Sequence, residues 1–237
     1  MNLSIVVPFY NEQDTVIQTL GRLSEVVWPD FVESTEVICV NDASTDDSLK
    51  QVKEFVSNHS NFYVFEMPEN SGKGAAVRFG FEQAKGDVFF IQDADLELLP
   101  SDIPSMLQAM HDLKVEFVNG SRYLPGVTRP IASYRRYIGN KYFTFVTSVL
   151  INVKLTDMAC GYKLITRNLY EQIRLKENRF GFEAELIMKA LRIKRNNVAE
   201  VPVHYFPRNV GQGKKLRTID ALRVFRTIFL YGVLRLK

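Results

Sequence analysis

Short apolar runs alternate with amphipathic stretches along the first half of the chain. The runs are rich in Val, Ile and Phe and predict buried strands at residues 3–8, 36–40, 62–67, 88–92 and 115–118. The stretches between them have helical spacing and predict helices at residues 13–27, 46–57, 74–84 and 102–113. Strands that alternate with helices in this way form parallel sheets. We therefore expect an α/β fold with a mostly parallel central sheet flanked by helices.

Beyond residue 124 the pattern changes. Residues 129–153 predict a helix with one apolar face, residues 156–167 a loop followed by a strand, and residues 182–191 a further helix. Residues 198–203 predict another strand and residues 218–236 a terminal helix. No repeat, low-complexity segment or linker divides the chain. We therefore expect one domain over residues 1–207, followed by a basic lid loop and an amphipathic helix in residues 208–237.

Clusters of polar residues follow five of the predicted strands. In a parallel sheet the carboxyl ends of the strands lie on one edge, and ligands bind in the crevice outside that edge. We therefore expect these clusters to form a single site. The clusters are Tyr10-Asn11-Glu12, Asn41-Asp42, residues 69–74, residues 93–97 and Ser121-Arg122.

The composition of this 237-residue chain, with 46% hydrophobic residues, is that of a folded domain with a sizeable core. Cys39 and Cys160 have no metal-ligand spacing, so we expect reduced core thiols in a cytosolic protein. The first residues lack the pattern of a signal peptide, and no apolar run reaches the roughly 18 residues of a spanning helix. These observations predict a cytoplasmic protein.

The net charge of +3 is small, but residues 208–237 hold eight basic residues and one acid, Asp220. This asymmetry indicates an anionic partner, which is a phosphate, a lipid headgroup or a nucleic acid. Apolar residues also recur there at helical spacing, as in helices that lie on anionic membranes. The alternatives are a stripe packed on the domain or on a second subunit, which would make a homo-oligomer. The stripe is Ile219, Leu222, Phe225, Phe229, Val233 and Leu236.

The segment Asp93-Ala94-Asp95 closes an apolar strand with two carboxylates one residue apart. Side chains at positions i and i+2 of a strand share a face, so both carboxylates point to one spot and repel unless a cation lies between them. Mg²⁺ and Mn²⁺ take oxygen ligands and are commonly held by one or two carboxylates together with substrate phosphates. The segment predicts a metal–diphosphate site; the alternative is a strand that ends in an acidic turn.

Four further features fit the same site, although each has a plainer interpretation. Gly72-Lys73-Gly74 precedes a helix start, where backbone N–H groups bind anions, but it is also an ordinary turn. Asp42 suits a nucleobase N–H or a ribose hydroxyl, or caps a helix. Arg122 suits a phosphate, or lies on the surface. The basic loop 208–215 suits a lid over a diphosphate, or is simply solvated.

Taken in order, these motifs resemble the family 2 glycosyltransferases of GT-A fold, which is Rossmann-like. They are most similar to the branch of dolichyl- and polyprenyl-phosphate sugar synthases. The resemblance covers nearly the whole chain. Its motifs are residues 5–12, 40–46, 70–74, 92–97 and 120–123, Thr156-Asp157, residues 160–163, and Arg208 with Gly213-Lys214.

The resemblance implies a role for each matching position. Asp93 and Asp95 would meet a Mg²⁺ or Mn²⁺ ion, and Glu97 would join them where this branch usually has Gln. Ala94 would lie against the ribose. The cations Arg122, Arg208 and Lys214 would act with Asp95 in catalysis by binding donor diphosphate or acceptor phosphate, with Arg136 as a further acceptor cation. The remaining donor-binding residues would be Pro8, Tyr10, Glu12, Val40, Asp42 and Lys73.

The implied reaction is an inverting, metal-dependent transfer of a hexose from a UDP- or GDP-sugar to a polyprenyl or dolichyl phosphate. The protein would then be peripheral on the cytoplasmic face of a membrane. One alternative is a GT-A transferase that uses a hydroxyl acceptor in glycan or polysaccharide synthesis. Another is a non-catalytic nucleotide-sugar-binding module. Nucleic acid is not an expected partner, because Asp93 and Asp95 would repel its backbone.

Overall fold

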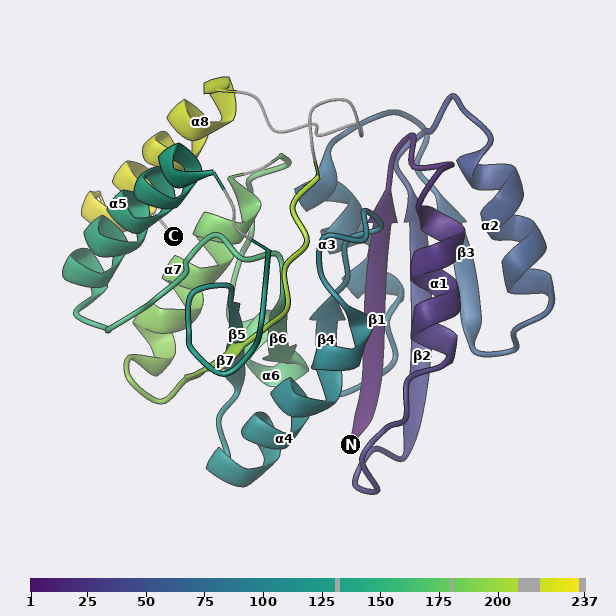
Figure 1. The fold of residues 1–237 in the computed structure, drawn as a ribbon, viewed down its shortest axis with the longest axis horizontal. Coiled ribbons are helices and arrows are strands. Elements are labelled where there is room, and N and C mark those ends of the chain that lie inside the picture. Colours follow the sequence, from purple (N-terminus) through teal and green to yellow (C-terminus); the bar gives the residue numbers. More distant parts are fainter. Residues whose placement is uncertain (131–132, 180, 209–217, 235–237) are drawn as a thin grey trace.

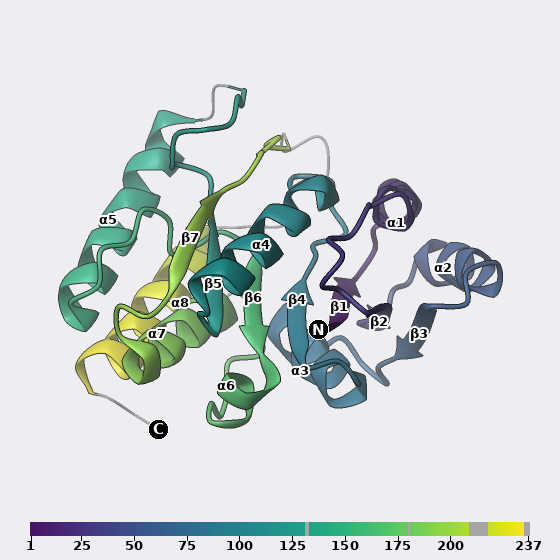
Figure 2. The ribbon, with the colours of Figure 1, turned by 90° about the horizontal axis from the view of Figure 1, so that it is seen from below.

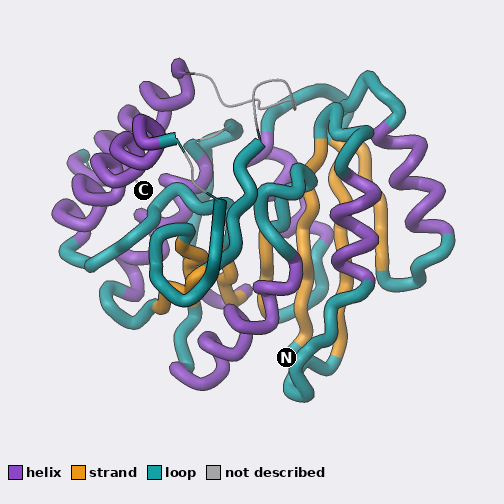
Figure 3. The backbone as a smooth tube through the Cα atoms, viewed as in Figure 1, coloured by secondary structure: helices purple, strands orange, loops and turns teal. Residues whose placement is uncertain are grey.

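The computed structural model describes residues 1–130, 133–179, 181–208 and 218–234, with side chains from Arg223 onward in the last segment (Figure 1). Within these residues a single sheet is flanked by helices on both faces, as the sequence predicts. Figure 3 shows the strands as one layer between helical layers.

In the described part of the chain, seven strands form the sheet in the order β3-β2-β1-β4-β6-β5-β7. Only β6 is antiparallel to its neighbours, so the predicted mostly parallel sheet is confirmed. The chain builds outward in one direction from β1 to β3 and in the other from β4. Such a reversal creates a crevice at the carboxyl ends of the two central strands. The strands are β1 (Asn2–Phe9), β2 (Ser34–Asn41), β3 (Phe62–Glu66), β4 (Val88–Ile91), β5 (Phe117–Ser121), β6 (Lys163–Thr166) and β7 (Ala199–Pro202).

Two hydrophobic layers cover the sheet, because successive side chains of each strand point to opposite faces. In β1, Ile5 and Val7 pack into the layer of α1 and α4, whereas Val6 packs into the layer of α3 and α7. Figure 2 shows these helices around the sheet from below. The helices are α1 (Val16–Ser24), α2 (Ser48–Ser57), α3 (Lys73–Gln83), α4 (Ile103–Leu113), α5 (Tyr134–Ile151), α6 (Arg167–Glu171), α7 (Phe182–Lys194) and α8 (Thr218–Ile228).

Some predicted boundaries differ from the structure. The helix predicted to start at residue 129 is α5 and begins at Tyr134, because Pro130 biases the residue before it away from helical geometry. The terminal helix changes after Ile228 into a π-helical segment, Phe229–Val233. The short helix α6, which directly follows β6, was not predicted from the sequence.

The antiparallel strand β6 brings an additional segment to the crevice. Because β6 runs against its neighbours, its first residue, Lys163, lies at the edge where the parallel strands end. The loop of residues 156–162 that leads into β6 therefore meets the polar clusters of the first half of the chain. This placement decides which residues of the second half reach the site.

Two helical glycines provide a matched test of the packing of α3 on the sheet. A Cβ at Gly80 would lie 2.5 Å from Val6 Cγ1, whereas a Cβ at Gly21 would meet no atom within 4 Å. We expect Gly80→Ala to lower the free energy of unfolding by about 1–3 kcal/mol through overpacking. Gly21→Ala should raise it by up to about 1 kcal/mol, because alanine is the better helix former. Denaturant unfolding of both variants measures this, and equal effects would contradict the packing described.

Candidate active site

A cleft of about 640 Å³ opens at the carboxyl ends of the central strands. Most of the predicted site residues line it, although they come from segments spread over nearly 200 positions: Pro8, Tyr10, Glu12, Asp42, Lys73, Asp93, Ala94, Asp95, Glu97, Arg122 and Arg208. A larger hollow of about 1090 Å³ lies between the carboxyl end of α5, α6 and α7. It contains none of those residues, so chemistry rather than size locates the site.

Asp93 and Asp95 lie beyond the last residue of β4, Ile91, where the chain enters a turn, so the prediction that they share a strand face is wrong. Each of the two aspartates nevertheless faces a cation from elsewhere in the chain. Lys73 Nζ lies 2.5 Å from Asp93 Oδ1, and Arg208 Nη2 lies 3.2 Å from Asp95 Oδ2. Arg208 also pairs with Glu12, with Nη1 2.9 Å from Oε2. These carboxylates are therefore compensated by residues that only the fold brings near them.

Negative charge is nevertheless concentrated around Asp95. Burial, together with the neighbouring carboxylates of Asp93 and Glu97, raises the pKa of Asp95 to about 7. Burial opposes the ammonium of Lys73, but Asp93 and Glu183 outweigh it and raise the Lys73 pKa above its ordinary value. Lys73 is therefore charged at neutral pH, and the cleft still attracts a further cation at Asp95.

The predicted metal residues are brought together only in part. In residues 1–130, 133–179, 181–208 and 218–234, no group of three His, Cys, Asp or Glu side chains is arranged to hold a metal ion. Glu97 instead accepts a hydrogen bond from the backbone N–H of Arg208, at 2.8 Å. The expected three-carboxylate group is thus not preassembled. Asp93 and Asp95 remain an oxygen-donor pair whose charge and chemistry fit Mg²⁺ or Mn²⁺.

Asp42 organises the turn that precedes α3. Its carboxylate accepts hydrogen bonds from the backbone N–H groups of Ser71, at 2.8 Å, and Gly72, at 2.9 Å, and from the Asn70 amide. Burial raises its pKa above the ordinary value, although those backbone donors oppose the shift. Gly72 has φ +99°, and a Cβ there would clash with the carbonyl oxygen of Asn178, so only glycine fits this turn. Asp42 therefore shapes the cleft as well as lining it.

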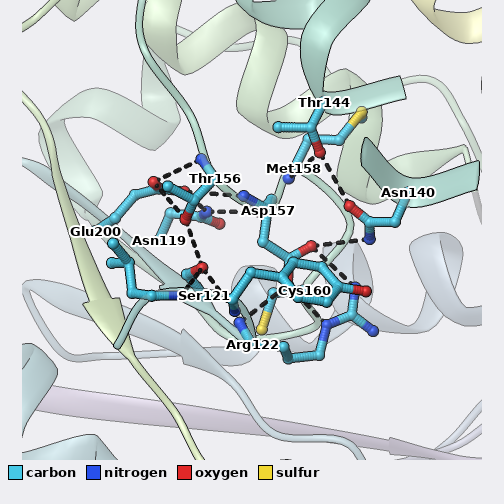
Figure 4. A network of polar contacts seen from close by, with 12 residues as sticks. Asn119, Ser121, Arg122, Asn140, Thr144, Thr156, Asp157, Met158, Cys160 and Glu200 are labelled. Carbon is cyan, nitrogen blue, oxygen red and sulfur yellow. Dashed lines mark hydrogen bonds and ion pairs between the residues drawn. The ribbon is translucent and has the colours of Figure 1, made fainter. Parts of the chain in front are cut away.

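Arg122 is held by a buried carboxylate in a polar network at the end of β5 (Figure 4). Its Nε and Nη2 donate to the two oxygens of Asp157, at 2.7 Å and 2.9 Å, and its backbone N–H donates to the same group. Asn140 of α5 donates to Asp157 as well. Burial by itself would raise the pKa of Asp157, but the adjacent Arg122 guanidinium outweighs burial and lowers the Asp157 pKa below its ordinary value. The guanidinium of Arg122 thus reaches the cleft in a fixed orientation.

Three of the predicted site residues do not line the cleft as described. Val40 is fully buried in the core, beside Val6 and Val77, because β2 is covered on both faces; its predicted contact with a nucleoside is wrong for the side chain. Arg136 is exposed on α5 and does not reach the cleft, so its prediction as an acceptor cation is not supported. Lys214 lies outside the described residues.

The cleft also holds residues that the sequence did not point to. Arg179, Glu183, Tyr205 and Arg223 all line it. Arg223 belongs to the basic segment 208–237, and that excess of positive charge was the one feature of the sequence that could have pointed to it. Glu183 gave none, because its partner Lys73 lies 110 residues earlier and only the packing of α7 against α3 joins them.

Comparisons with known proteins place the chain in a family. A family profile described as "Glycosyl transferase family 2" matches residues 4–174. The chain is 29% identical to a dolichyl-phosphate beta-glucosyltransferase of Trichomonas vaginalis, covering 94% of this chain and 72% of the relative. It is 28% identical to a dolichol-phosphate mannosyltransferase of Saccharomyces cerevisiae, covering 89% and 80%.

A solved structure shares the fold. It is glucosyl-3-phosphoglycerate synthase from Mycobacterium tuberculosis in complex with Mn²⁺, uridine diphosphate and glucosyl-3-phosphoglycerate. Its TM-score is 0.72 at 18% identity, with 98% of this chain and 80% of that chain covered. At this identity the similarity establishes the fold only.

The Arg122–Asp157 pair yields a stability prediction. Asp157→Asn leaves the mostly buried guanidinium of Arg122 without its fully buried anion and should lower the free energy of unfolding at pH 7 by about 3 kcal/mol. Because the Asp157 pKa is lowered in the folded state, the pair stabilises above the ordinary carboxyl pKa of about 4 and loses this effect as pH falls through the lowered value. The difference between wild type and variant should therefore shrink in acid.

Denaturant unfolding between pH 7 and pH 3 measures this difference. The matched control is Asp30→Asn, an exposed aspartate in the loop between α1 and β2, and it should leave the unfolding curve unchanged. A difference between wild type and Asp157→Asn that stays constant with pH would contradict the assigned ion pair.

Proposed function

This chain belongs to glycosyl transferase family 2, and we propose that it transfers a hexose from a nucleotide diphosphate sugar to a polyprenyl or dolichyl phosphate, with inversion. The observation that carries the proposal is the cleft in which two aspartates and three basic side chains, Lys73, Arg122 and Arg208, converge. The dolichyl-phosphate transferases named among its relatives support this acceptor class.

The donor would lie along the carboxyl ends of β1, β2 and β4. Asp42 and the turn that it holds would bound the nucleoside end, and Ala94, between the two aspartates, would lie against the ribose. The diphosphate would meet the basic side chains that line the cleft. Arg208 has a donor suited to it, because its Nε is buried without a hydrogen-bond partner among the described residues.

Asp93 and Asp95 would hold a Mg²⁺ or Mn²⁺ ion, with Glu97 nearby. When bound, such an ion supplies positive charge that stabilises the departing nucleoside diphosphate. Related structures with Mn²⁺ or Mg²⁺ and uridine diphosphate support this choice of metals. The base stays open, and UDP- and GDP-sugars both fit the proposal.

A phosphate acceptor accounts for the abundance of basic residues around the cleft. A hydroxyl acceptor needs a general base to remove its proton, whereas a phosphate is already ionised near neutral pH and needs cations to bind it. Arg122, held by Asp157, would bind the acceptor phosphate in a fixed orientation, and Arg208 would assist. The acceptor oxygen would then attack the anomeric carbon from the face opposite the leaving diphosphate.

Two neighbouring helices give the protein an apolar face toward its surroundings. On α5, large apolar side chains are exposed at helical spacing: Tyr134, Ile138, Tyr142, Phe145 and Val149. The segment from α8 into the π helix contacts α5 and exposes Phe225, Phe229 and Val233, while Ile228 and Tyr231 pack on the domain. The described members of the predicted stripe thus face outward rather than into the core.

We infer that this face rests on a membrane that carries the lipid phosphate. Exposed Arg226 lies beside the apolar residues, and basic side chains next to an apolar face favour anionic membranes. In the described ranges no helix is long and apolar enough to cross a bilayer. We propose a peripheral position on the cytoplasmic face, and a homo-oligomer through the same apolar face is the alternative.

The transfer reaction is tested directly with the metal-site carboxylate. Asp95→Asn should reduce sugar transfer to polyprenyl phosphate by about 10³-fold or more, because the charge that binds the metal and diphosphate is lost. The measurement is the transfer of radiolabelled hexose from UDP- and GDP-sugars with Mn²⁺. Asp112→Asn, remote on α4, is the control and should retain wild-type turnover. Unchanged turnover in Asp95→Asn would contradict the assignment of Asp95 to the metal site. Transfer of sugar only to soluble hydroxyl acceptors would contradict the assignment of a lipid phosphate as the acceptor.

The membrane face is tested with vesicles. Phe145→Ser combined with Phe229→Ser should lower binding to vesicles of mixed neutral and anionic lipids by about tenfold or more, because two exposed aromatic side chains are removed. Flotation of the protein with the vesicles gives the bound fraction. Val27→Ser removes an even more exposed apolar residue next to α1 and should have no effect. Equal losses in both variants, or a dimer that the double variant dissociates, would argue against membrane contact.

A further inference from the structure

Lys73 is shared between two carboxylates that come from different parts of the chain. Its Nζ lies 2.5 Å from Asp93 Oδ1 at the end of β4 and 2.7 Å from Glu183 Oε1 in the first turn of α7. The side chain of Lys73 is only 17% exposed and that of Glu183 only 13%. An ammonium in such surroundings interacts strongly with both anions, because water screens it poorly.

This arrangement raises a physical problem once a divalent cation reaches Asp93. The ammonium occupies one of the oxygens that the ion would use, and two positive charges would stand within a few ångströms of each other. Lys73 must then release Asp93 without losing all compensation for its own buried charge. Glu183 is an anion already in contact with the ammonium, on the side away from β4.

The backbone around this triad is closely packed, and the long side chain of Lys73 is the group best able to adjust. A Cβ at Gly74 would clash with the carbonyl oxygen of Glu177 and with Phe182 Cβ, which shows how closely the start of α3 packs on the start of α7. A Cβ at Gly161 would clash with the Asp93 carboxylate, so that loop forms a wall behind it. The lysine stem has four rotatable carbons and a point charge that tolerates several partners.

We propose that Glu183 is a positioning residue that retains Lys73 when a divalent cation takes over Asp93. Lys73 then serves as the built-in counter-ion of Asp93 in the free protein and moves its interaction to Glu183 as the metal binds. The proposal rests on the proposed function, because it requires a metal ion at Asp93. It adds a role for a residue of α7 that does not itself need to touch the ion.

The test is the binding of Mn²⁺ alone, measured by isothermal titration calorimetry on the full chain. Glu183→Gln leaves Lys73 with Asp93 as its only anion, so the lysine competes harder and Mn²⁺ should bind about tenfold more weakly, or about 1.4 kcal/mol. Lys73→Gln removes the competitor and should bind Mn²⁺ more tightly than wild type. In the Lys73→Gln background, Glu183→Gln should have little further effect, and Glu183→Asp should largely retain wild-type binding.

A matched control and a fold check accompany the titrations. Glu177→Gln changes an acid in the loop before α7 whose partner is Arg226, and it should leave Mn²⁺ affinity unchanged. Thermal unfolding of every variant identifies any that do not fold. If Glu183→Gln does not fold, the Mn²⁺ affinity of Glu183→Asp is compared with that of wild type instead.

The outcomes separate this inference from the function on which it rests. If wild type binds no Mn²⁺, the metal site of the proposed function fails and the inference falls with it. If wild type binds Mn²⁺ and Glu183→Gln binds it equally well, only the inference is overturned. If Glu183→Gln weakens binding equally with and without Lys73, Glu183 acts by long-range attraction and the positioning role is refuted. Weakening that depends on Lys73 supports the proposal.

Discussion

The repulsion among the carboxylates at the end of β4 is the constraint on which the site depends. Asp93, Asp95 and Glu97 lie within five residues, and burial together with their mutual repulsion disfavours charge on Asp95. The fold holds them there by bringing one cation from the start of α3 and another from the loop after β7. Each of these cations is itself shared with a second acid, Glu183 or Glu12. The cleft is therefore a balanced set of charges rather than a row of independent ligands.

The second half of the chain completes this balance. The antiparallel strand β6 lies between β4 and β5, and its leading loop places Asp157 behind Arg122 and Gly161 behind Asp93. Fully buried Asp157 fixes the guanidinium in a planar, two-point contact, which a lysine could not reproduce. A cation oriented in this way contributes to binding without first losing side-chain freedom.

The acceptor side follows from features at a distance from the aspartates. The exposed apolar side chains of α5, and those exposed after Arg223, do not pack into the core. The opposite side of the terminal helix packs on the domain through Ile228 and Tyr231. Helices that pack on one side and expose aromatic residues on the other suit an interface between water and lipid. A polar cleft and an apolar face within one domain match the proposed reaction between a water-soluble donor and a lipid-borne acceptor.

The sequence by itself determined the class of the fold and the edge of the sheet at which the site lies. Strand and helix periods are local, and polar residues at strand ends must gather where parallel strands end, so Asp42, Asp93 and Asp95 could be placed without coordinates. Only the tertiary structure decided the partners of these residues. The pairing of Lys73 with Glu183 and of Arg122 with Asp157 joins positions 110 and 35 residues apart. No local pattern encodes such pairs, because they depend on the insertion of β6 and on the packing of α7 against α3. Val40 lies two residues before Asp42 and was predicted in the site. Its side chain instead lies in the core, because β2 is covered on both faces.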